Sequence, residues 1–319
     1  MSADTILTTV RQYLEFDPTE KVTIEPIQRG ASGRTIVRIK TEEYEPFIGI
    51  HWTDERPEND LLPDITHFLA KAGINVAGVL HEDRKWRVML VEDLGDENLL
   101  MLKDEPWEVR EPYYRSIFEQ LDKLYYSRPP KEMEFNLPFD EERYRWEQEY
   151  FCKRLAGDLL NMDASAILSS PEFRDLAKRL GSVSKHLVHR DFQSQNIMLF
   201  EGDAWWIDYQ GMRRGRQEYD LASLIYDPYM DHHADERERL LDLWEDISEE
   251  RPSDDMFRDC AIQRLMQALG AYGNIIWNYE NDWYRQHVPV AARLLTRVVE
   301  GTPYEALLEP FLEKAMAYK

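Results

Sequence analysis

A single polar hairpin interrupts a long helical region, and this interruption constrains the fold more than any other feature. Residues 186–209, HLVHRDFQSQNIMLFEGDAWWIDY, contain two short apolar stretches, IMLF and AWWID, which the turn EGD separates. Polar residues come directly before the first stretch and directly after the second. Two apolar stretches joined by a short turn predict a β-hairpin, and the polar side chains then lie at its neighbouring ends.

The first third of the chain carries the pattern of a small antiparallel sheet. Residues 34–40 alternate apolar and polar side chains, as do parts of 22–27, and the loop QRGASG joins the two. This alternation predicts a hairpin around a glycine-containing loop. Further apolar strands are expected at 46–52 and 86–95, with a helix between them at 63–72.

From about residue 97 onward, apolar side chains lie three and four positions apart, which is typical of amphipathic helices. The stretches with this spacing are 109–126, 141–160, 257–277 and 303–317. A strand-rich start followed by a helical region predicts an α+β fold with two lobes and a cleft between them. We expect a small antiparallel-sheet lobe over residues 1–95 and a larger, mostly helical lobe over 96–319.

Composition narrows the function classes. The chain has 319 residues, 43% of them hydrophobic and 31% charged, which is enough apolar material for a core. Its net charge of −22 disfavours binding to nucleic acid or to anionic lipid. Two cysteines cannot form a disulfide framework or a cysteine-rich zinc site. The start of the chain does not resemble a signal peptide, and no apolar stretch could span a bilayer, so we expect a soluble cytoplasmic protein.

Acidic and amide side chains recur in the hairpin region at a spacing suited to phosphoryl transfer. His189, Arg190 and Asp191 are followed by Asn196, and the second apolar stretch ends at Asp208. The order HRDxxxxN, then a strand ending in Asp, is used for phosphoryl transfer from ATP. Mg²⁺ prefers oxygen ligands, which Asn196 and Asp208 would supply. Asp191 would then accept the proton of the attacking hydroxyl.

The alternative for these residues is a surface turn followed by a capped strand end. Each motif taken alone is common in such turns. Their order, the hairpin between them and the acidic motif EYD downstream favour the kinase interpretation.

The loop between the first two predicted strands is expected to cover phosphates. Backbone amides freed by Gly30 and Gly33 can approach phosphate oxygens closely, and Ser32 can add a hydroxyl. The alternative is an ordinary glycine-bearing hairpin turn.

One side chain expected of a protein kinase is missing. Protein kinases place a lysine on the strand after the glycine loop to hold the phosphates. The corresponding stretch FIGIHW contains His51 and no lysine. Lys40, Arg38 and Arg34 are possible substitutes, and spacing does not choose among them.

The segments LVHRDFQSQNIML, WWIDYQG and EYDLASLIYDPY resemble the aminoglycoside phosphotransferase and choline kinase superfamily. Within it, the likeness is greatest to bacterial amino-sugar kinases that act on N-acetylmuramate and N-acetylglucosamine at the anomeric hydroxyl. Those relatives also have HRDFQSxN as their catalytic loop. LVEDLGD, FDEERYRWEQEYF and QRLMQALGAYG extend the likeness over most of the chain. The resemblance implies a protein-kinase-like two-lobed fold and a sugar kinase that uses ATP and Mg²⁺.

The resemblance also implies roles for individual residues. Asp191 is expected as the catalytic base, and Asn196 and Asp208 as Mg²⁺ ligands. The backbone from Glu92 to Leu94 would meet adenine as the hinge. Asp220 would anchor the loop beneath the site.

The acceptor is expected to be a sugar or an amino sugar. Arg213, which precedes two more arginines in GMRRGRQEYD, could bind a carboxylate or a phosphate. Glu147 could bind a sugar hydroxyl or amide, because the corresponding helix of these kinases borders the acceptor pocket, and Asp227 could line the same side. The alternatives are a solvated loop for Arg213 and an exposed Glu147 beside an aromatic core stripe.

Two other functions stay open. The first is a kinase of the same fold that acts on an aminoglycoside, a choline-like compound or another small metabolite. The second is a pseudokinase-like binding protein without activity, which the missing lysine suggests. The oligomeric state is not predicted.

Overall fold

The computed structural model describes residues 2–16, 19, 21–27, 33–182 and 186–318. Its first part contains a five-stranded antiparallel sheet with the strand order β1-β2-β3-β5-β4. The strands are β1 (Thr23–Pro26), β2 (Arg34–Lys40), β3 (Phe47–Trp52), β4 (Val79–Asp83) and β5 (Val88–Glu92). The antiparallel sheet expected at the start of the chain is confirmed, and β4 adds a strand that the sequence pattern did not predict.

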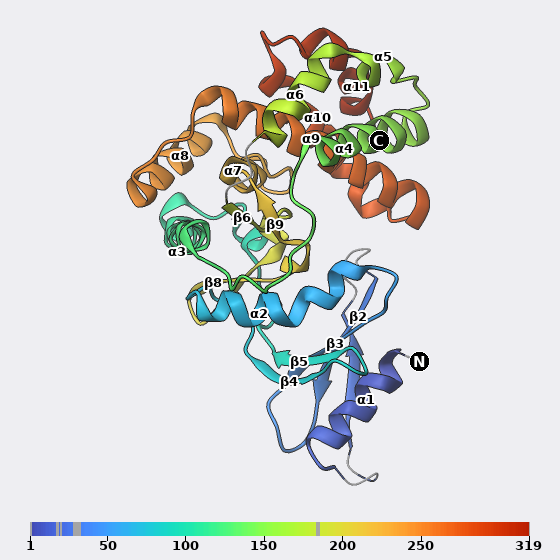
Figure 1. Cartoon of the computed structure of the whole chain (residues 1–319), viewed down its shortest axis with the longest axis vertical. Helices are drawn as coiled ribbons and strands as arrows, with labels where there is room; N and C mark the ends of the chain where they lie inside the picture. The colour runs from blue at the N-terminus through green and yellow to red at the C-terminus, as the bar shows by residue number, and fades with distance from the viewer. Residues whose placement is uncertain (1, 17–18, 20, 28–32, 183–185, 319) are drawn as a thin grey trace.

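One face of the sheet is covered by α1 (Ser2–Tyr13) (Figure 1). Ile6 and Val10 of this helix form a small apolar cluster with Val37 and Ile39 of β2. The helix approaches β3 so closely that a Cβ at Gly49 would lie 2.6 Å from Ile6 Cγ2. A larger residue at Gly49 would therefore push α1 away from the sheet.

The other face of the sheet packs toward α2 (Leu62–Lys71), which crosses between the sheet and the helical part (Figure 1). Leu62 and Ile65 of α2 share an apolar cluster with Met89 and Val91 of β5. The intervening Leu90 belongs to the cluster under α1. Because successive strand residues point to opposite faces, β5 contributes to both layers.

The remainder of the chain is mostly helical (Figure 1). Its α-helices are α3 (Trp107–Tyr126), α4 (Glu141–Phe151), α5 (Ser165–Ser169), α6 (Pro171–Gly181), α7 (Gln217–Ile225), α8 (Ala234–Ser248), α9 (Asp254–Tyr279), α10 (His287–Val299) and α11 (Glu305–Met316). Helix α4 continues as a π-helical segment over Cys152–Leu159. Helical spacing thus predicted α3, α4, α9 and α11 correctly, but it did not distinguish the π-helical segment from an α-helix.

Two short strand pairs interrupt the helices. β7 (Ile197–Phe200) and β8 (Asp203–Trp206) form an antiparallel hairpin in which Ile197 pairs with Trp206. This is the hairpin that the sequence predicts. β6 (His186–Val188) pairs with β9 (Arg213–Gly215) beside it.

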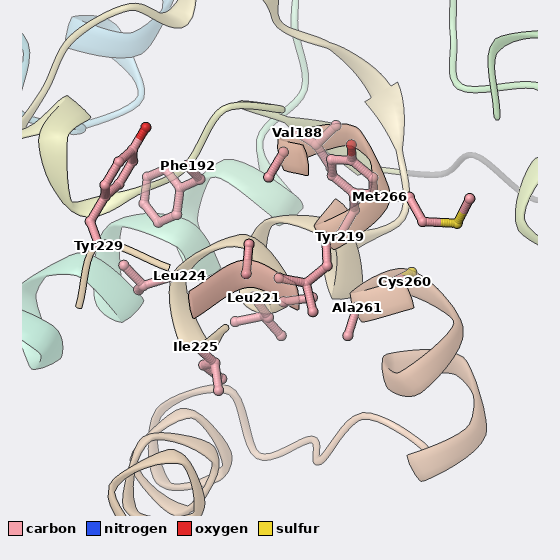
Figure 2. Packing of buried hydrophobic residues seen from close by; sticks show 14 of the residues in the cluster. Val188, Phe192, Tyr219, Leu221, Leu224, Ile225, Tyr229, Cys260, Ala261 and Met266 are labelled. Atoms are coloured by element: carbon pink, nitrogen blue, oxygen red, sulfur yellow. The ribbon is translucent and has the colours of Figure 1, made fainter. Parts of the chain in front are cut away.

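The core beneath these strands is formed by α7 and α9. Figure 2 shows Leu221 and Leu224 of α7 and Ala261 of α9 packed with Val188 and Phe192. The last two residues flank the segment that carries the polar motif. The motif therefore rests on a rigid apolar base rather than on a free surface loop.

The sheet and the helical part are joined by backbone contacts and by a shared core. Trp206 N donates to Asn75 O at 2.8 Å. The apolar cluster that contains Val91 extends into the helices. A lobe boundary after residue 95 stays a prediction. Within the part of the chain that the structure describes, no helix is long and apolar enough to cross a membrane.

Candidate active site

The β7–β8 hairpin brings the three predicted phosphoryl-transfer residues together. Ile207 N donates to Asn196 O at 3.0 Å, so Asp208 follows directly beside Asn196. Asn196 Nδ2 donates to the backbone oxygen of Asp191 at 2.8 Å. Asp191, Asn196 and Asp208 therefore border one small region at the open end of the hairpin.

Two buried carboxylates hold the loop that carries Asp191. Asp220 on α7 accepts hydrogen bonds from His189 N at 2.7 Å and from Arg190 N at 2.9 Å. Asp227 accepts one from Ser194 N at 2.8 Å. Burial raises the pKa of Asp220 to about 7, and it also raises the pKa of Asp227. Asp220 thus occupies the anchoring position that the resemblance implies.

His189 connects the two arms of the hairpin region. Its Nε2 lies 3.0 Å from Ile207 O, and since a carbonyl oxygen can only accept, Nε2 carries the proton. The ring lies against Phe192 and Trp206. Burial lowers the pKa of His189, so the imidazole is neutral near pH 7. The bond to Ile207 O and the contacts of the ring hold His189 between the loop and the end of β8.

Asp191 is charged despite its surroundings. Its side chain is 29% exposed, and Arg190 Nε lies 3.7 Å from Asp191 Oδ2. Burial disfavours the carboxylate, but the guanidinium groups of Arg190 and Arg264 outweigh it and lower the pKa of Asp191. A carboxylate that is ionised at neutral pH can accept a proton from a hydroxyl group.

Asp208 has an unusual backbone conformation at the end of the hairpin. Its φ is +65°, in the left-handed region that residues other than glycine adopt rarely. Gln210 Nε2 donates to Asp208 Oδ1 at 3.2 Å, and Arg34 of β2 forms an ion pair with the same oxygen. Such a conformation persists where surrounding contacts determine it, and it often marks a functional position.

The oxygen atoms of Asn196 and Asp208 are suited to a hard cation. The bond from Asn196 to Asp191 uses the amide nitrogen and leaves the amide oxygen as the acceptor. Among the described residues, no cluster of three or more His, Cys, Asp and Glu side chains is arranged to hold a metal ion. Mg²⁺ is commonly bound by one or two carboxylates together with substrate phosphates and water. The donor set therefore fits a cation that is bound together with a nucleotide.

The predicted nucleotide contacts are only partly described. Gly30 and Ser32 lie outside the described residues. Gly33 has φ +70° and directly precedes β2. Glu92 ends β5, where its backbone nitrogen donates to Gly78 O at 2.9 Å, and the side chain of Leu94 is buried in the core. Their contact with adenine stays a prediction.

The three residues predicted to bind the acceptor lie inside the protein. Glu147 is 1% exposed, and its carboxylate accepts hydrogen bonds from Tyr219 Oη and Gln263 Nε2, both at 3.0 Å. Burial raises the pKa of Glu147. Both oxygens of Glu147 are thus engaged by donors of the protein itself.

Arg213 and Asp227 are also internal. Arg213 Nε donates to Gly211 O at 3.1 Å, and its guanidinium lies over the ring of Phe139 at 5.2 Å. Burial lowers the pKa of Arg213 to about 10. Asp227 is fully buried and is engaged by backbone nitrogens. These contacts are made within the protein, and a role of the three residues toward the acceptor stays a prediction.

Comparison with known proteins agrees with this geometry. Residues 23–257 match the phosphotransferase enzyme family. The chain belongs to that family. It is 27% identical over 263 residues to an N-acetylmuramate/N-acetylglucosamine kinase of Neisseria meningitidis, covering 74% of this chain and 75% of the relative. It is 25% identical over 275 residues to a kinase of the same name from Pseudomonas aeruginosa, covering 80% and 78%.

Solved structures show that the fold is shared over nearly the whole chain. A choline kinase from Streptococcus pneumoniae has a TM-score of 0.64 at 14% identity, covering 94% of this chain and 99% of that chain. An amicoumacin kinase in complex with AMP-PNP and Ca²⁺ also has a TM-score of 0.64, at 13% identity, covering 95% and 96%. An aminoglycoside phosphotransferase with ADP bound has a TM-score of 0.56 at 10% identity, covering 92% and 97%. The protein is thus a small-molecule phosphotransferase with an α+β kinase fold.

One charged residue beside the candidate site was not predicted. Arg264 on α9 is nearly buried, and its Nη2 donates to Gln193 Oε1 in the catalytic loop at 3.1 Å. Its Nε donates to Ser223 Oγ at 2.8 Å. The available signal was an arginine in the middle of the apolar stretch QRLMQALGAYG, where a charge needs a partner.

Proposed function

We propose that this phosphotransferase transfers the γ-phosphate of ATP to the anomeric hydroxyl of N-acetylmuramate or N-acetylglucosamine. The observation that carries the proposal is the convergence of Asp191, Asn196 and Asp208 at the end of one hairpin. The names of the two relatives from Neisseria and Pseudomonas supply the acceptor. Because the proposed reaction uses ATP, we place it in the cytoplasm, where ATP is available.

Asp191 is the proposed catalytic base. Its carboxylate accepts the proton of the sugar hydroxyl while the hydroxyl oxygen forms a bond to the γ-phosphorus and the bond to the ADP oxygen breaks. Asp220 and Asp227 support the proposal because they fix the loop by three hydrogen bonds to its backbone. A base held in this way needs little reorganisation when the acceptor arrives.

Asn196 and Asp208 are the proposed ligands of Mg²⁺. Bound with ATP, Mg²⁺ would neutralise charge on the β- and γ-phosphates. Asp208 directs its carboxylate through the left-handed turn at the hairpin end, and Asn196 is oriented by its bond to the Asp191 carbonyl. The glycine loop with Gly30, Ser32 and Gly33 is proposed to cover the phosphates, and the backbone from Glu92 to Leu94 to bind adenine.

The test is a panel of acceptors with purified protein, ATP and Mg²⁺. The panel contains N-acetylmuramate, N-acetylglucosamine, an aminoglycoside and choline, and ADP release is measured for each. We expect release with the two amino sugars, and a phosphorus NMR signal of an anomeric phosphate in the product. Asp191→Asn is expected to lower the rate by roughly 100-fold or more, with the ATP affinity unchanged.

Each other result has a defined meaning. Release with the aminoglycoside or with choline alone would replace the proposed acceptor. If none of the acceptors causes ADP release although the protein binds ATP tightly, a binding protein without activity is favoured. Full turnover by Asp191→Asn would remove the assignment of the base.

A further inference from the structure

The three basic residues that could replace the missing lysine make different contacts in the structure. Lys40 at the end of β2 pairs with Glu25 at 2.8 Å on the exposed surface. Arg38, two positions before it, makes hydrogen bonds to Asp93 and Asp96, which follow β5. These contacts tie both cations to the sheet and to the chain that leaves it. Of the three candidates on β2, Arg34 is the one that contacts the β7–β8 hairpin.

His51 does not supply the missing positive charge. It lies on β3 opposite Thr35 of β2. Burial, followed by the charge of Arg87, lowers the pKa of His51. Its imidazole is therefore neutral near pH 7, whereas the lysine of protein kinases is a permanent cation.

Arg34 reaches from the sheet to the proposed metal ligand. It is the first residue of β2, directly after Gly33 of the glycine loop. Its Nη1 donates to Gln210 Oε1 at 2.8 Å, and its Nη2 forms the ion pair with Asp208 Oδ1. The side chain is only 5% exposed. A buried guanidinium thus follows Gly33 directly in sequence and contacts the carboxylate proposed to bind the cation.

We propose that Arg34 holds the phosphates of bound ATP, in the role of the missing lysine. The inference rests on the proposed function, because it concerns ATP at that site. A cation held by Asp208 would compete with the guanidinium for the carboxylate and would repel it. The donors of Arg34 would then be available to phosphate oxygens, which suit its planar fork through two parallel hydrogen bonds. In this proposal Arg34 pairs with Asp208 in the absence of ATP and binds the phosphates when ATP is present.

Equilibrium binding of nucleotides tests this role apart from turnover. Isothermal titration calorimetry measures the affinities of adenosine, ADP and the ATP analogue AMP-PNP, the last two with Mg²⁺, for the parent protein and for Arg34→Gln, Arg34→Lys and Lys40→Gln. Arg34→Gln is expected to weaken AMP-PNP binding roughly 10- to 100-fold and to leave adenosine binding unchanged. Arg34→Lys is expected to recover part of the loss.

Lys40→Gln is the matched control. It removes one positive charge from the same strand, at a position paired with Glu25 on the surface. Its affinity for AMP-PNP is expected to equal that of the parent. Thermal melting of each variant checks that it is folded at the temperature of the titration. If Arg34→Gln is unfolded there, Arg34→Lys serves as the test.

Several outcomes would overturn the inference. They are normal or tighter AMP-PNP binding by Arg34→Gln, an equal loss of adenosine binding, or a lysine variant no better than the glutamine variant. A parent protein that phosphorylates an amino sugar, with Arg34→Gln binding AMP-PNP normally, overturns the role of Arg34 and leaves the proposed function intact. A parent protein that binds no ATP overturns both.

Discussion

Two aspartates of the catalytic loop region have opposite electrostatic environments. Asp220 is fully buried, and although two backbone N–H groups favour its charged form, burial raises its pKa to about 7. At Asp191, the guanidinium groups of Arg190 and Arg264 outweigh burial and lower the pKa. Near neutral pH, Asp191 is therefore ionised while Asp220 titrates. The proposed base is thus ionised, whereas the buried carboxylate that holds its loop is partly protonated near pH 7.

The raised pKa of Asp220 predicts a pH dependence of stability. Between the unfolded pKa of 3.8 and the folded pKa of about 7, the folded state binds more protons than the unfolded state. The free energy of unfolding therefore falls as pH rises through this window and is level above it. Asp220→Asn lacks this titration. The stability difference, parent minus variant, is expected to fall by about 2 to 3 kcal/mol from pH 5 to pH 8.

Urea unfolding of both proteins at pH 5, 6, 7 and 8 measures the difference. Other titrating groups cancel in the subtraction, because they are the same in the two proteins. A difference that stays constant over this range would show that Asp220 has an ordinary pKa in the folded protein.

The sequence predicted correctly that three of the candidate site residues lie near one another. Asp191, Asn196 and Asp208 span one loop and one hairpin, so the local pattern is enough to bring them together. Burial of Glu147 and the contact of Arg34 with Asp208 depend on elements far apart in sequence. No local pattern encodes which side chain fills a space between such elements, and this is why spacing could not show the burial of Glu147 or the contact of Arg34 with Asp208.

At the scale of elements, the spacing of apolar residues did not predict how closely two helices cross. The π-helical segment Cys152–Leu159 packs against α9, where a Cβ at Gly273 would lie 2.5 Å from Arg154 O. Apolar spacing predicted a helix in both places. It could not show that their backbones meet, because this requires the position of each helix in space.

This crossing predicts contrasting effects for two glycines. Gly273→Ala forces α9 away from the π-helical segment and is expected to lower the free energy of unfolding by about 1 to 3 kcal/mol. Gly157→Ala is the matched control, because its Cβ would meet Cys152 O at 3.5 Å, an ordinary contact. It is expected to cost nothing or to stabilise slightly. Equal losses in urea unfolding of the two variants would contradict the close crossing.

The whole molecule combines a net charge of −22 with arginines around its proposed site. Arg34 contacts Asp208, Arg190 follows His189 in the loop, and Arg264 contacts Gln193. Net charge acts over distances that salt screens, whereas these arginines act within a few ångströms. Local cations of this kind are what the proposed binding of ATP to an acidic protein requires. Composition predicted the overall sign of the charge, but the places of these arginines depend on elements far apart in sequence.

The shared core predicts that the sheet and the helices unfold together. Met89 and Val91 of β5 belong to the same apolar cluster as Trp206 of the hairpin and Leu265 of α9, and one backbone hydrogen bond joins Asn75 to Trp206. Separating the two parts would expose this cluster, so neither part has a complete core of its own. The small cluster under α1 is separate, and α1 is expected to open first.

Hydrogen exchange with mass spectrometry at increasing urea concentration tests this cooperativity. Peptides from residues 34–52 and 257–277 are expected to lose protection at one common urea midpoint, which coincides with the loss of helical circular dichroism. Peptides from residues 2–13 are expected to exchange at lower urea. A lower midpoint for 34–52 than for 257–277 would mean that the sheet unfolds independently, and the predicted boundary after residue 95 would then separate two folding units rather than two parts of one core.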